Sequence, residues 1–211
     1  MNLAQELAQG IAGLGLSVSL EQQQKLLDYI ALLHKWNKTY NLTAIRGPQQ
    51  MVSNHLLDSL AITTHLWSGR WLDVGCGAGL PGVVMAIVQP DWQLTLLDSN
   101  SKKTGFVQQA VIELGLKNVR VECARIEDFQ AAERFDGIVS RAFAELGDFL
   151  RVTHRLLAPA GRWAAMKGWA EKELATMPDD CVVEQIITLK VPGLEAARSL
   201  VIAAQKEVTN D

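Results

Sequence analysis

The stretch from Trp71 to Gly82 constrains the fold of this chain more than any other part of it. A short apolar run with one acidic residue, Asp73, comes first, and glycines then follow at positions 75, 77, 79 and 82. An apolar run resumes after the last glycine, so this order predicts a buried strand, a tight turn and a helix. Glycine permits positive φ and a close approach of backbone to ligand. Because a helix N-terminus also offers unpaired N–H groups, the stretch predicts a site for a nucleotide-type cofactor.

After Trp71 the sequence alternates between strand-like and helix-like patterns. Such alternation is typical of right-handed crossovers that build a parallel sheet with helices on both faces. Two β-rich runs near the C-terminus predict an antiparallel hairpin at the sheet edge. The predicted fold is therefore α/β and Rossmann-like, with a mostly parallel seven-stranded sheet. The first strand begins at Trp71, and the others are expected at Gln93–Asp98, Val119–Cys123, Phe135–Ser140, Trp163–Met166 (after a break at Pro159–Gly161), Val182–Val191 and Leu200–Ala204.

Residues 1–66 are expected to form a helical extension, and residues 67–211 the α/β domain. Ser19 and Gln22 make a capping box, which predicts that a long helix starts there. Gly47-Pro48 marks a turn before a third helix, because proline fits the first turn of a helix.

The composition is that of a globular protein, with 48% hydrophobic and 20% charged residues. The three cysteines are far apart and form no C-x-x-C pair, which favours a reducing compartment and predicts no metal site. No apolar run approaches the length of a membrane span, and the N-terminus lacks the pattern of a signal peptide. We therefore expect a cytoplasmic protein.

The formal net charge of −3 gives no overall attraction to nucleic acid. An RNA partner would need a local basic surface, for which the sequence offers Lys35, Lys38, Arg46, Lys102 and Lys103. Trp36 and Tyr40 can stack on a base, as in single-stranded RNA recognition, but their helical spacing favours packing in the core.

Two cofactor classes fit the glycine stretch. Gly77-x-Gly79-x-x-Gly82 matches the dinucleotide fingerprint of an NAD-dependent oxidoreductase. In such a site the first glycine directly follows an apolar strand end, a pattern that Asp73 interrupts here. Read from that acid, Asp-x-Gly-x-Gly-x-Gly resembles the first motif of class I methyltransferases that use S-adenosylmethionine (AdoMet). Asp73 can engage the ammonium group of AdoMet, and Asp98, at the end of the next predicted strand, can accept both ribose hydroxyls. The five predicted strands followed by a terminal hairpin match the seven-stranded sheet of methyltransferases, and they favour AdoMet over a dinucleotide.

Two absences narrow the methyl acceptor. The sequence has no Pro-Cys dipeptide for cytosine C5 methylation and no Pro-Pro-aromatic motif for methylation of an exocyclic amine. An acceptor atom with its own lone pair remains, and such an atom needs no covalent activation. A non-catalytic RNA-binding module with a vestigial loop is the second alternative.

Longer motifs carry a more specific resemblance. They are Leu33-His34-Lys35-Trp36-Asn37-Lys38-x-Tyr40-Asn41-Leu42-Thr43, His55-x-Leu57-Asp58-Ser59, Asp73 to Gly82, Leu97-Asp98-Ser99, Ser140-Arg141-Ala142 and Lys167-Gly168. In this order they resemble the RsmG family, also called GidB, over nearly the whole chain. That family methylates guanine N7 in bacterial 16S ribosomal RNA, at position 527 in the decoding region. Because guanine N7 has a free lone pair, the resemblance implies that no general base is needed and that catalysis comes from positioning and the exclusion of water. The resemblance implies AdoMet as cofactor and 16S ribosomal RNA as partner. We expect a monomer that acts on a small subunit or an assembly intermediate.

The resemblance also assigns residues. By position, the family's AdoMet contacts match Gly75, Leu80, Ile126, Glu127 and Arg141, and the loop and strand-end arguments add Asp73, Gly77, Gly79 and Asp98. The predicted catalytic residues are Arg141, Asn41 and Lys167, and the predicted RNA contacts are His55, Ser59, Lys102 and Lys103. An arginine that donated to both O6 and N7 of guanine would occupy the attacking lone pair. Arg141 is therefore expected to grip O6, a phosphate or the cofactor carboxylate.

Overall fold

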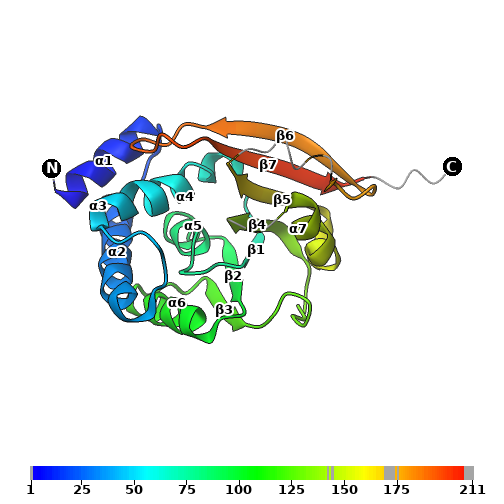
Figure 1. Ribbon diagram of the computed structural model, residues 1–211, viewed down its shortest axis with the longest axis horizontal. Coiled ribbons are helices and arrows are strands. Elements are labelled where there is room, and N and C mark those ends of the chain that lie inside the picture. The colour runs from blue at the N-terminus through cyan, green and yellow to red at the C-terminus, as the bar shows by residue number, and fades with distance from the viewer. Residues whose placement is uncertain (1, 142, 144, 169–173, 175, 207–211) are drawn as a thin grey trace.

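The structure is a computed structural model that describes residues 2–141, 143, 145–168, 174 and 176–206 (Figure 1). Within these residues, seven strands form one sheet in the order β3-β2-β1-β4-β5-β7-β6. Strands β1 to β5 run parallel, and β7 is antiparallel to β5 and β6, so the predicted sheet and hairpin are confirmed. The strands are β1 Arg70–Val74, β2 Gln93–Asp98, β3 Val119–Cys123, β4 Phe135–Arg141, β5 Leu157–Lys167, β6 Cys181–Leu189 and β7 Arg198–Gln205.

The strand order changes direction at β1, whose neighbours are β2 on one side and β4 on the other. Ligands of open α/β sheets bind outside the carboxyl ends of the strands at such a point. Asp73 pairs with Leu96 and Val74 with Leu97, so β1 and β2 end at the same edge. The fold therefore places the glycine stretch where a ligand is expected.

Helices cover both faces of the sheet (Figure 1). Along β1, Trp71 belongs to one apolar core, whereas Leu72 and Val74 belong to the core on the opposite face. The first core is shared by the N-terminal helices with α5 and α6, and the second contains α7. The helices outside the N-terminal region are α5 Gly82–Val88, α6 Ser101–Glu113 and α7 Leu146–Thr153, the last continued by the 3-10 turn η3 His154–Leu156.

The N-terminal region is helical, as predicted. The capping box is present, because Gln22 N donates to Ser19 Oγ (3.2 Å) and Ser19 N donates to Gln22 Oε1 (3.0 Å). The region shares one core with the sheet, and its division from the α/β domain at residue 66 stays a prediction. Its elements are α1 Leu3–Gly13, α2 Leu20–Tyr40, α3 Pro48–Met51, η1 Val52–Leu57, α4 Asp58–Leu60 and the 3-10 turn η2 Thr63–His65.

Two elements differ from the sequence expectation. The third helix is not uniform, because η1 in its middle is π-helical, a feature often found at functional sites. The break predicted at Pro159–Gly161 lies inside β5, where the pairing with β4 shifts register between Phe135 and Gly137. An irregularity of this kind accommodates a proline, which cannot donate to the ladder. No helix in the part of the chain that the structure describes is both long and apolar enough to cross a bilayer.

Candidate functional site

The glycine loop after β1 is held by backbone hydrogen bonds to the end of β2. The N–H groups of Gly75 and Cys76 both donate to Leu97 O, at 2.8 and 3.0 Å. Gly77 N donates to Asp98 Oδ2 at 2.9 Å, and Asn100 N donates to the other carboxylate oxygen at 2.8 Å. Both oxygens of Asp98 therefore accept backbone hydrogen bonds at the half-buried end of β2.

Two glycines of the loop have opposite surroundings. Gly75 has φ +68°, and a Cβ built on it would meet nothing within 4 Å. Gly82 begins α5, and its Cβ would lie 2.0 Å from Leu96 Cδ2 and 2.7 Å from Asp73 Oδ2. Gly75 therefore leaves open space at the carboxyl edge of the sheet, whereas Gly82 allows α5 to pack against the strands.

Asp73 is fully buried beneath the start of α5. Its Oδ2 accepts a hydrogen bond from Gly82 N at 2.8 Å, and its Oδ1 has no hydrogen-bond partner among the described residues. Burial raises the pKa of this carboxyl to about 7, against the opposing effects of the Gly82 N–H and of Arg141. A buried acceptor without a partner is costly, so Asp73 suits a ligand that brings a polar or cationic group. Burial also raises the pKa of the neighbouring Cys76 thiol, which argues against a thiolate nucleophile in the loop.

A tyrosine from the N-terminal region holds the same loop. Tyr29 on α2 is completely buried, and its hydroxyl donates to Ala78 O at 2.6 Å. Its ring also packs near Phe106 of α6. The loop is therefore fixed from the helical side as well as from the sheet.

The segment after β3 is held by an arginine. Ile126 is buried and Glu127 is exposed, and the carbonyl oxygens of both accept hydrogen bonds from Arg155 Nη2, at 2.7 and 3.2 Å. The same nitrogen donates to Phe129 O at 2.8 Å. A planar guanidinium that binds three carbonyl groups fixes the path of the segment.

Arg141 lies at the carboxyl end of β4 and reaches into the N-terminal helical region. Its Nη1 donates to Asn54 O at 2.9 Å and to Asp58 Oδ2 at 3.3 Å. Its Nη2 lies 3.5 Å from His55 Nδ1. The charge of Arg141 also lowers the pKa of Asp73, so it acts on the buried acid of the glycine loop.

His55 connects Arg141 to the loop that follows α2. Its side chain is 4% exposed, and its Nε2 lies 3.0 Å from Thr43 Oγ1. Burial, followed by the charge of Arg141, lowers the pKa of His55 to about 4. The imidazole is therefore neutral at neutral pH, and a proton on Nε2 lets Nδ1 face the guanidinium as an acceptor.

Comparison with known sequences decides the family. The sequence model of the family described as "GidB: rRNA small subunit methyltransferase G" matches residues 22–201. A protein of Laribacter hongkongensis named ribosomal RNA small subunit methyltransferase G is 54% identical over 202 residues, which cover 95% of this chain and 98% of that protein. A protein of the same name from Neisseria meningitidis serogroup B is 50% identical, over 98% of this chain and all of that protein. The chain belongs to the GidB family.

Solved structures agree with this membership at the level of the fold. A SAM-dependent methyltransferase from Aquifex aeolicus superposes with a TM-score of 0.58 at 21% identity and covers 80% of this chain and 96% of that chain. The N-methyltransferase NodS from Bradyrhizobium japonicum, in complex with S-adenosyl-L-homocysteine, has a TM-score of 0.58 at 15% identity and covers 83% of this chain and 99% of that one. The sheet of this GidB-family chain is thus of the methyltransferase type.

The structure gathers some of the residues predicted for this GidB-family site and buries others. Lys167 ends β5 next to β4, is 8% exposed, and donates from Nζ to Phe143 O at 3.1 Å. Ser59 is completely buried, and a buried position favours a supporting role over RNA contact for it and for His55. Leu80 is buried in the turn before α5. The direct roles of all predicted site residues stay predictions.

Three predicted residues lie nearer the surface. Asn41 ends α2 with φ +51°, and its side-chain oxygen accepts from Arg46 Nη2 at 2.9 Å. Lys102 is exposed and Lys103 half-buried in the first turn of α6. Asn41 lies two residues before Thr43, whose hydroxyl contacts His55, and His55 in turn lies beside Arg141.

Sequence reasoning gave no role to four residues that the structure places around the site: Tyr29, Asp58, Arg155 and Arg198. Asp58 stands inside a quoted motif, which was an available signal. The other three donate hydrogen bonds to backbone carbonyl groups or to Asp58, across more than 25 residues of sequence. No local sequence pattern predicts contacts of this kind.

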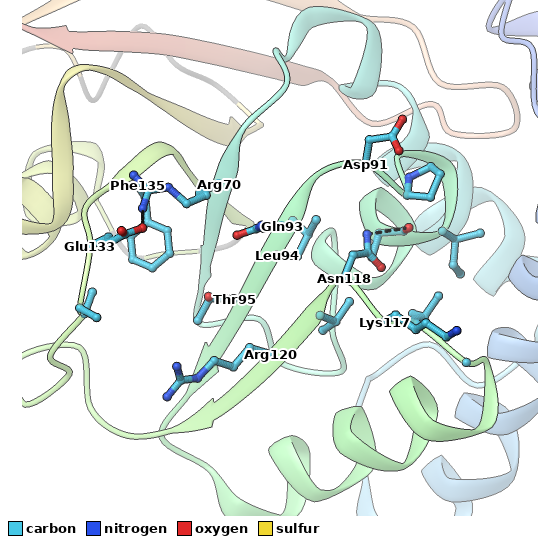
Figure 2. Close-up of a pocket in the computed structure, with 18 of the residues that line it drawn as sticks. Arg70, Asp91, Gln93, Leu94, Thr95, Lys117, Asn118, Arg120, Glu133 and Phe135 are labelled. Atoms are coloured by element: carbon cyan, nitrogen blue, oxygen red, sulfur yellow. Dashed lines mark hydrogen bonds and ion pairs between the residues drawn. The ribbon is translucent and has the colours of Figure 1, made fainter.

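A wide groove of about 930 Å³ lies at the amino ends of the strands, opposite the glycine loop (Figure 2). Several of its polar side chains have contacts that hold the fold together. Arg70 pairs with Glu133, and Asn118 Nδ2 donates to the carbonyl oxygens of Ala86, Gln89 and Trp92. This groove is therefore not where this fold class binds its cofactor.

Proposed function

We propose that this chain transfers a methyl group from AdoMet to N7 of a guanine in 16S ribosomal RNA, at position 527 of the small subunit. The observation that carries the proposal is the family match over residues 22–201. It is supported by the glycine loop that follows β1 and by the buried Asp73 beside that loop. The NAD-dependent oxidoreductase is not favoured, because the strand that precedes the glycines ends in Asp73-Val74 and the family is one of methyltransferases.

AdoMet supplies an electrophilic methyl group on a sulfonium, and the residues of the chain hold and orient it. Asp73 offers its unpartnered Oδ1 to the ammonium group, and Asp98 offers its ordered carboxylate to the ribose. Gly75 provides the open space that the ligand fills, with Gly77, Gly79 and Leu80 shaping the loop. Ile126 packs on the adenine, and Glu127 accepts its amino group.

The acceptor site requires positioning rather than proton transfer. Guanine N7 carries a free lone pair, and the imidazole of His55 beside Arg141 is neutral and held between Thr43 and that arginine. Arg141 Nη1 already donates to Asn54 O and to Asp58 Oδ2, and Nη2 lies 3.5 Å from His55 Nδ1, so among the described contacts Nε and the second hydrogen of Nη2 are left for a ligand. This arrangement supports a grip on O6, a phosphate or the cofactor carboxylate, with N7 left open.

The remaining predicted residues surround the acceptor. We propose that Asn41 and Lys167 approach the target nucleotide, that Lys102 and Lys103 bind phosphates, and that His55 and Ser59 support the residues that do. Lys102 and Lys103 open α6, a helix that also packs near Trp36 of α2. Trp36 is packed against the core, as its spacing predicts, while Tyr40 is 45% exposed.

We further propose that the substrate is the RNA within a small subunit or an assembly intermediate, in the cytoplasm. A net charge of −3 supports this, because ribosomal protein and folded RNA would add contacts that bulk charge does not provide. A monomer is supported by the scatter of the exposed large apolar side chains among the described residues, which lie on α2, α6 and β6.

The test is to map 7-methylguanine in 16S ribosomal RNA from cells that lack their own copy of the enzyme. The wild-type chain should restore the modification at position 527, and Arg141→Ala and Asp73→Ala should not. Purified chain with radiolabelled AdoMet should methylate small subunits faster than naked 16S RNA. Modification of naked 16S RNA and of small subunits at equal rates would overturn the proposal that the substrate is the assembled subunit. Tight NAD binding without AdoMet binding would overturn the proposed methyltransferase activity.

A further inference from the structure

We propose that Asp58 is the positioning residue for Arg141, and that Arg198 in turn holds Asp58. The inference rests on the proposed function of Arg141. Asp58 is 2% exposed and its two oxygens have different partners. Oδ2 accepts from Arg141 Nη1 at 3.3 Å, and Oδ1 accepts from Arg198 Nε at 3.1 Å. One buried carboxylate therefore joins the end of β4 to the start of β7.

The π-helical turn supplies the second acceptor for Arg141. The Asp58 N–H bonds to the carbonyl oxygens of Ser53 and His55 and passes over that of Asn54. The oxygen that is passed over accepts from Arg141 Nη1 at 2.9 Å. A regular α-helix would bond the Asp58 N–H to Asn54 O, so the π turn makes this carbonyl available. Nη1 is thus held by a side chain and a carbonyl from one short segment.

Charge explains why the carboxylate is shared by two arginines. A single Asp58–Arg141 pair would neutralise the guanidinium, whereas Arg141 and Arg198 around one carboxylate leave a net charge of +1. The neighbouring His55 adds none, because its imidazole is neutral. The side chains of Arg141 and Arg198 are 22% and 28% exposed, so the positive charge stays accessible. Such a cluster suits an anionic group of the cofactor or the RNA.

The same carboxylate also connects the C-terminal hairpin to the site. Arg198 begins β7, directly after the hairpin turn, in which Pro192 lies beside Gly13 of α1 and Gly193 beside Ser53 of η1. The hairpin turn and the N-terminal helices therefore meet around Asp58, as Figure 1 shows for α1 and the end of the β6–β7 hairpin. Arg141 is oriented by elements from both ends of the chain.

The test compares Asp58→Asn with Arg141→Ala. Asparagine keeps the shape and one acceptor of Asp58 but removes its charge. For each variant, kcat, the KM for small subunits and the Kd for AdoMet are measured. We expect D58N to change the same constants that R141A changes, and to lower kcat/KM about 10- to 100-fold. The double variant D58N/R141A should be no worse than R141A alone, because both changes remove one interaction. Multiplicative losses in the double variant would overturn the proposal.

A second variant and an independent readout guard against a simple loss of folding. Arg198→Ala should give a smaller loss of the same kind, and Arg198→Lys should restore part of it. In spectra of ¹⁵N-labelled arginine side chains, the Nε–H signals of Arg141 and Arg198 should both move in D58N. The matched control is Asp136→Asn, which removes a carboxylate that accepts from Arg70 N at the opposite edge of the sheet. D136N should move neither signal and should keep wild-type kinetics.

The outcomes separate the two proposals. If R141A is inactive while D58N has wild-type constants and unmoved arginine signals, Asp58 does not position Arg141, and the proposed function stands. If R141A itself is as active as the wild type, the role proposed for Arg141 fails first.

Discussion

The hydroxyl of Tyr29 lies 2.6 Å from the carbonyl oxygen of Ala78, so helix α2 directly holds the loop that we expect to bind AdoMet. Tyr29 is completely buried, and burial raises the pKa of its phenol, which keeps the hydroxyl protonated as a donor. The helical region thus contributes to the proposed cofactor site itself as well as to its surroundings.

Tyr29→Phe should destabilise the fold and weaken AdoMet binding together. Removal of the hydroxyl leaves Ala78 O buried without this donor, at a cost of about 1–3 kcal/mol. Chemical denaturation gives the stability, and calorimetric titration gives the affinity for AdoMet. The matched control is Tyr40→Phe, since Tyr40 is 45% exposed. Equal behaviour of the two variants would refute the role of Tyr29.

Gly75→Ala should leave the fold intact and abolish AdoMet binding. The added methyl group would strain a backbone at φ +68°, at roughly 1–2 kcal/mol, and would enter the open space reserved for the ligand. Gly15 is a close control, because it has the same φ of +68° and its Cβ would also meet nothing within 4 Å. Gly15→Ala should therefore lose similar stability but bind AdoMet normally. A G75A variant that still binds AdoMet would show that the ligand lies elsewhere.

Gly82→Ala should fail for a different reason. Its Cβ would overlap Leu96 Cδ2 at 2.0 Å in the core beneath α5. We expect the free energy of unfolding to fall by about 1–3 kcal/mol, and the midpoint of the unfolding transition to fall with it, whether or not AdoMet is present. Rescue of the G82A fold by AdoMet would contradict this assignment.

Much of the fold was predictable from local pattern. The capping box of Ser19 and Gln22, the glycine stretch and the strand–helix alternation are local signals, and each appears in the structure where the sequence puts it. The bulge in β5 was not predictable, because Pro159 and Gly161 read as a break unless the neighbouring strand is known. The π-helical turn in η1 likewise depends on what Arg141 offers from β4.

The site was predictable only in part. Strand-end residues such as Asp73, Asp98 and Arg141 follow from the rule that parallel strands end at one edge. Supporting contacts depend on tertiary packing. Arg155 donates to the carbonyl oxygens of Ile126 and Phe129 from the 3-10 turn η3, 29 and 26 residues later, and Arg198 donates to Asp58 from 140 residues later in the chain.

Asp73 should make AdoMet binding depend on pH. Its pKa in the folded protein is about 7, and an ammonium group binds the charged carboxylate, so affinity should rise about tenfold from pH 6 to pH 8. Asp73→Asn should remove this part of the dependence, which calorimetry at pH 6, 7 and 8 measures. Without ligand the effect on folding has the opposite sign. Between about pH 4 and 7 the folded state keeps a proton that the unfolded chain loses, so this group lowers stability as pH rises. A wild-type affinity with the same pH dependence as D73N would exclude the role.

Arg155→Ala should weaken AdoMet binding with little change in kcat. Loss of the guanidinium frees the carbonyl oxygens of Ile126, Glu127 and Phe129, so the segment proposed to hold the adenine is no longer fixed. We expect the Kd for AdoMet to rise about tenfold, which corresponds to about 1.4 kcal/mol of binding free energy. Arg151→Ala is the control, because Arg151 pairs with Asp148 on the surface of α7. A lowered kcat with unchanged Kd would place Arg155 in another role.

His55 should stay neutral well below its ordinary pKa. Burial and the charge of Arg141 lower its pKa to about 4, so the unfolded chain takes up a proton near pH 6.5 that the folded state refuses until about pH 4. The stability from this group is complete above pH 6.5 and is lost as pH falls toward 4, on the order of 2 kcal/mol by pH 5. In a histidine NMR titration, the signal that disappears in His55→Gln should remain at its neutral position down to about pH 5. The H55Q variant should also lose less stability than the wild type over that range. If this signal titrated near pH 6.5, His55 would become charged beside Arg141. The contacts from Thr43 through a neutral His55 to the Arg141 guanidinium would then be wrong.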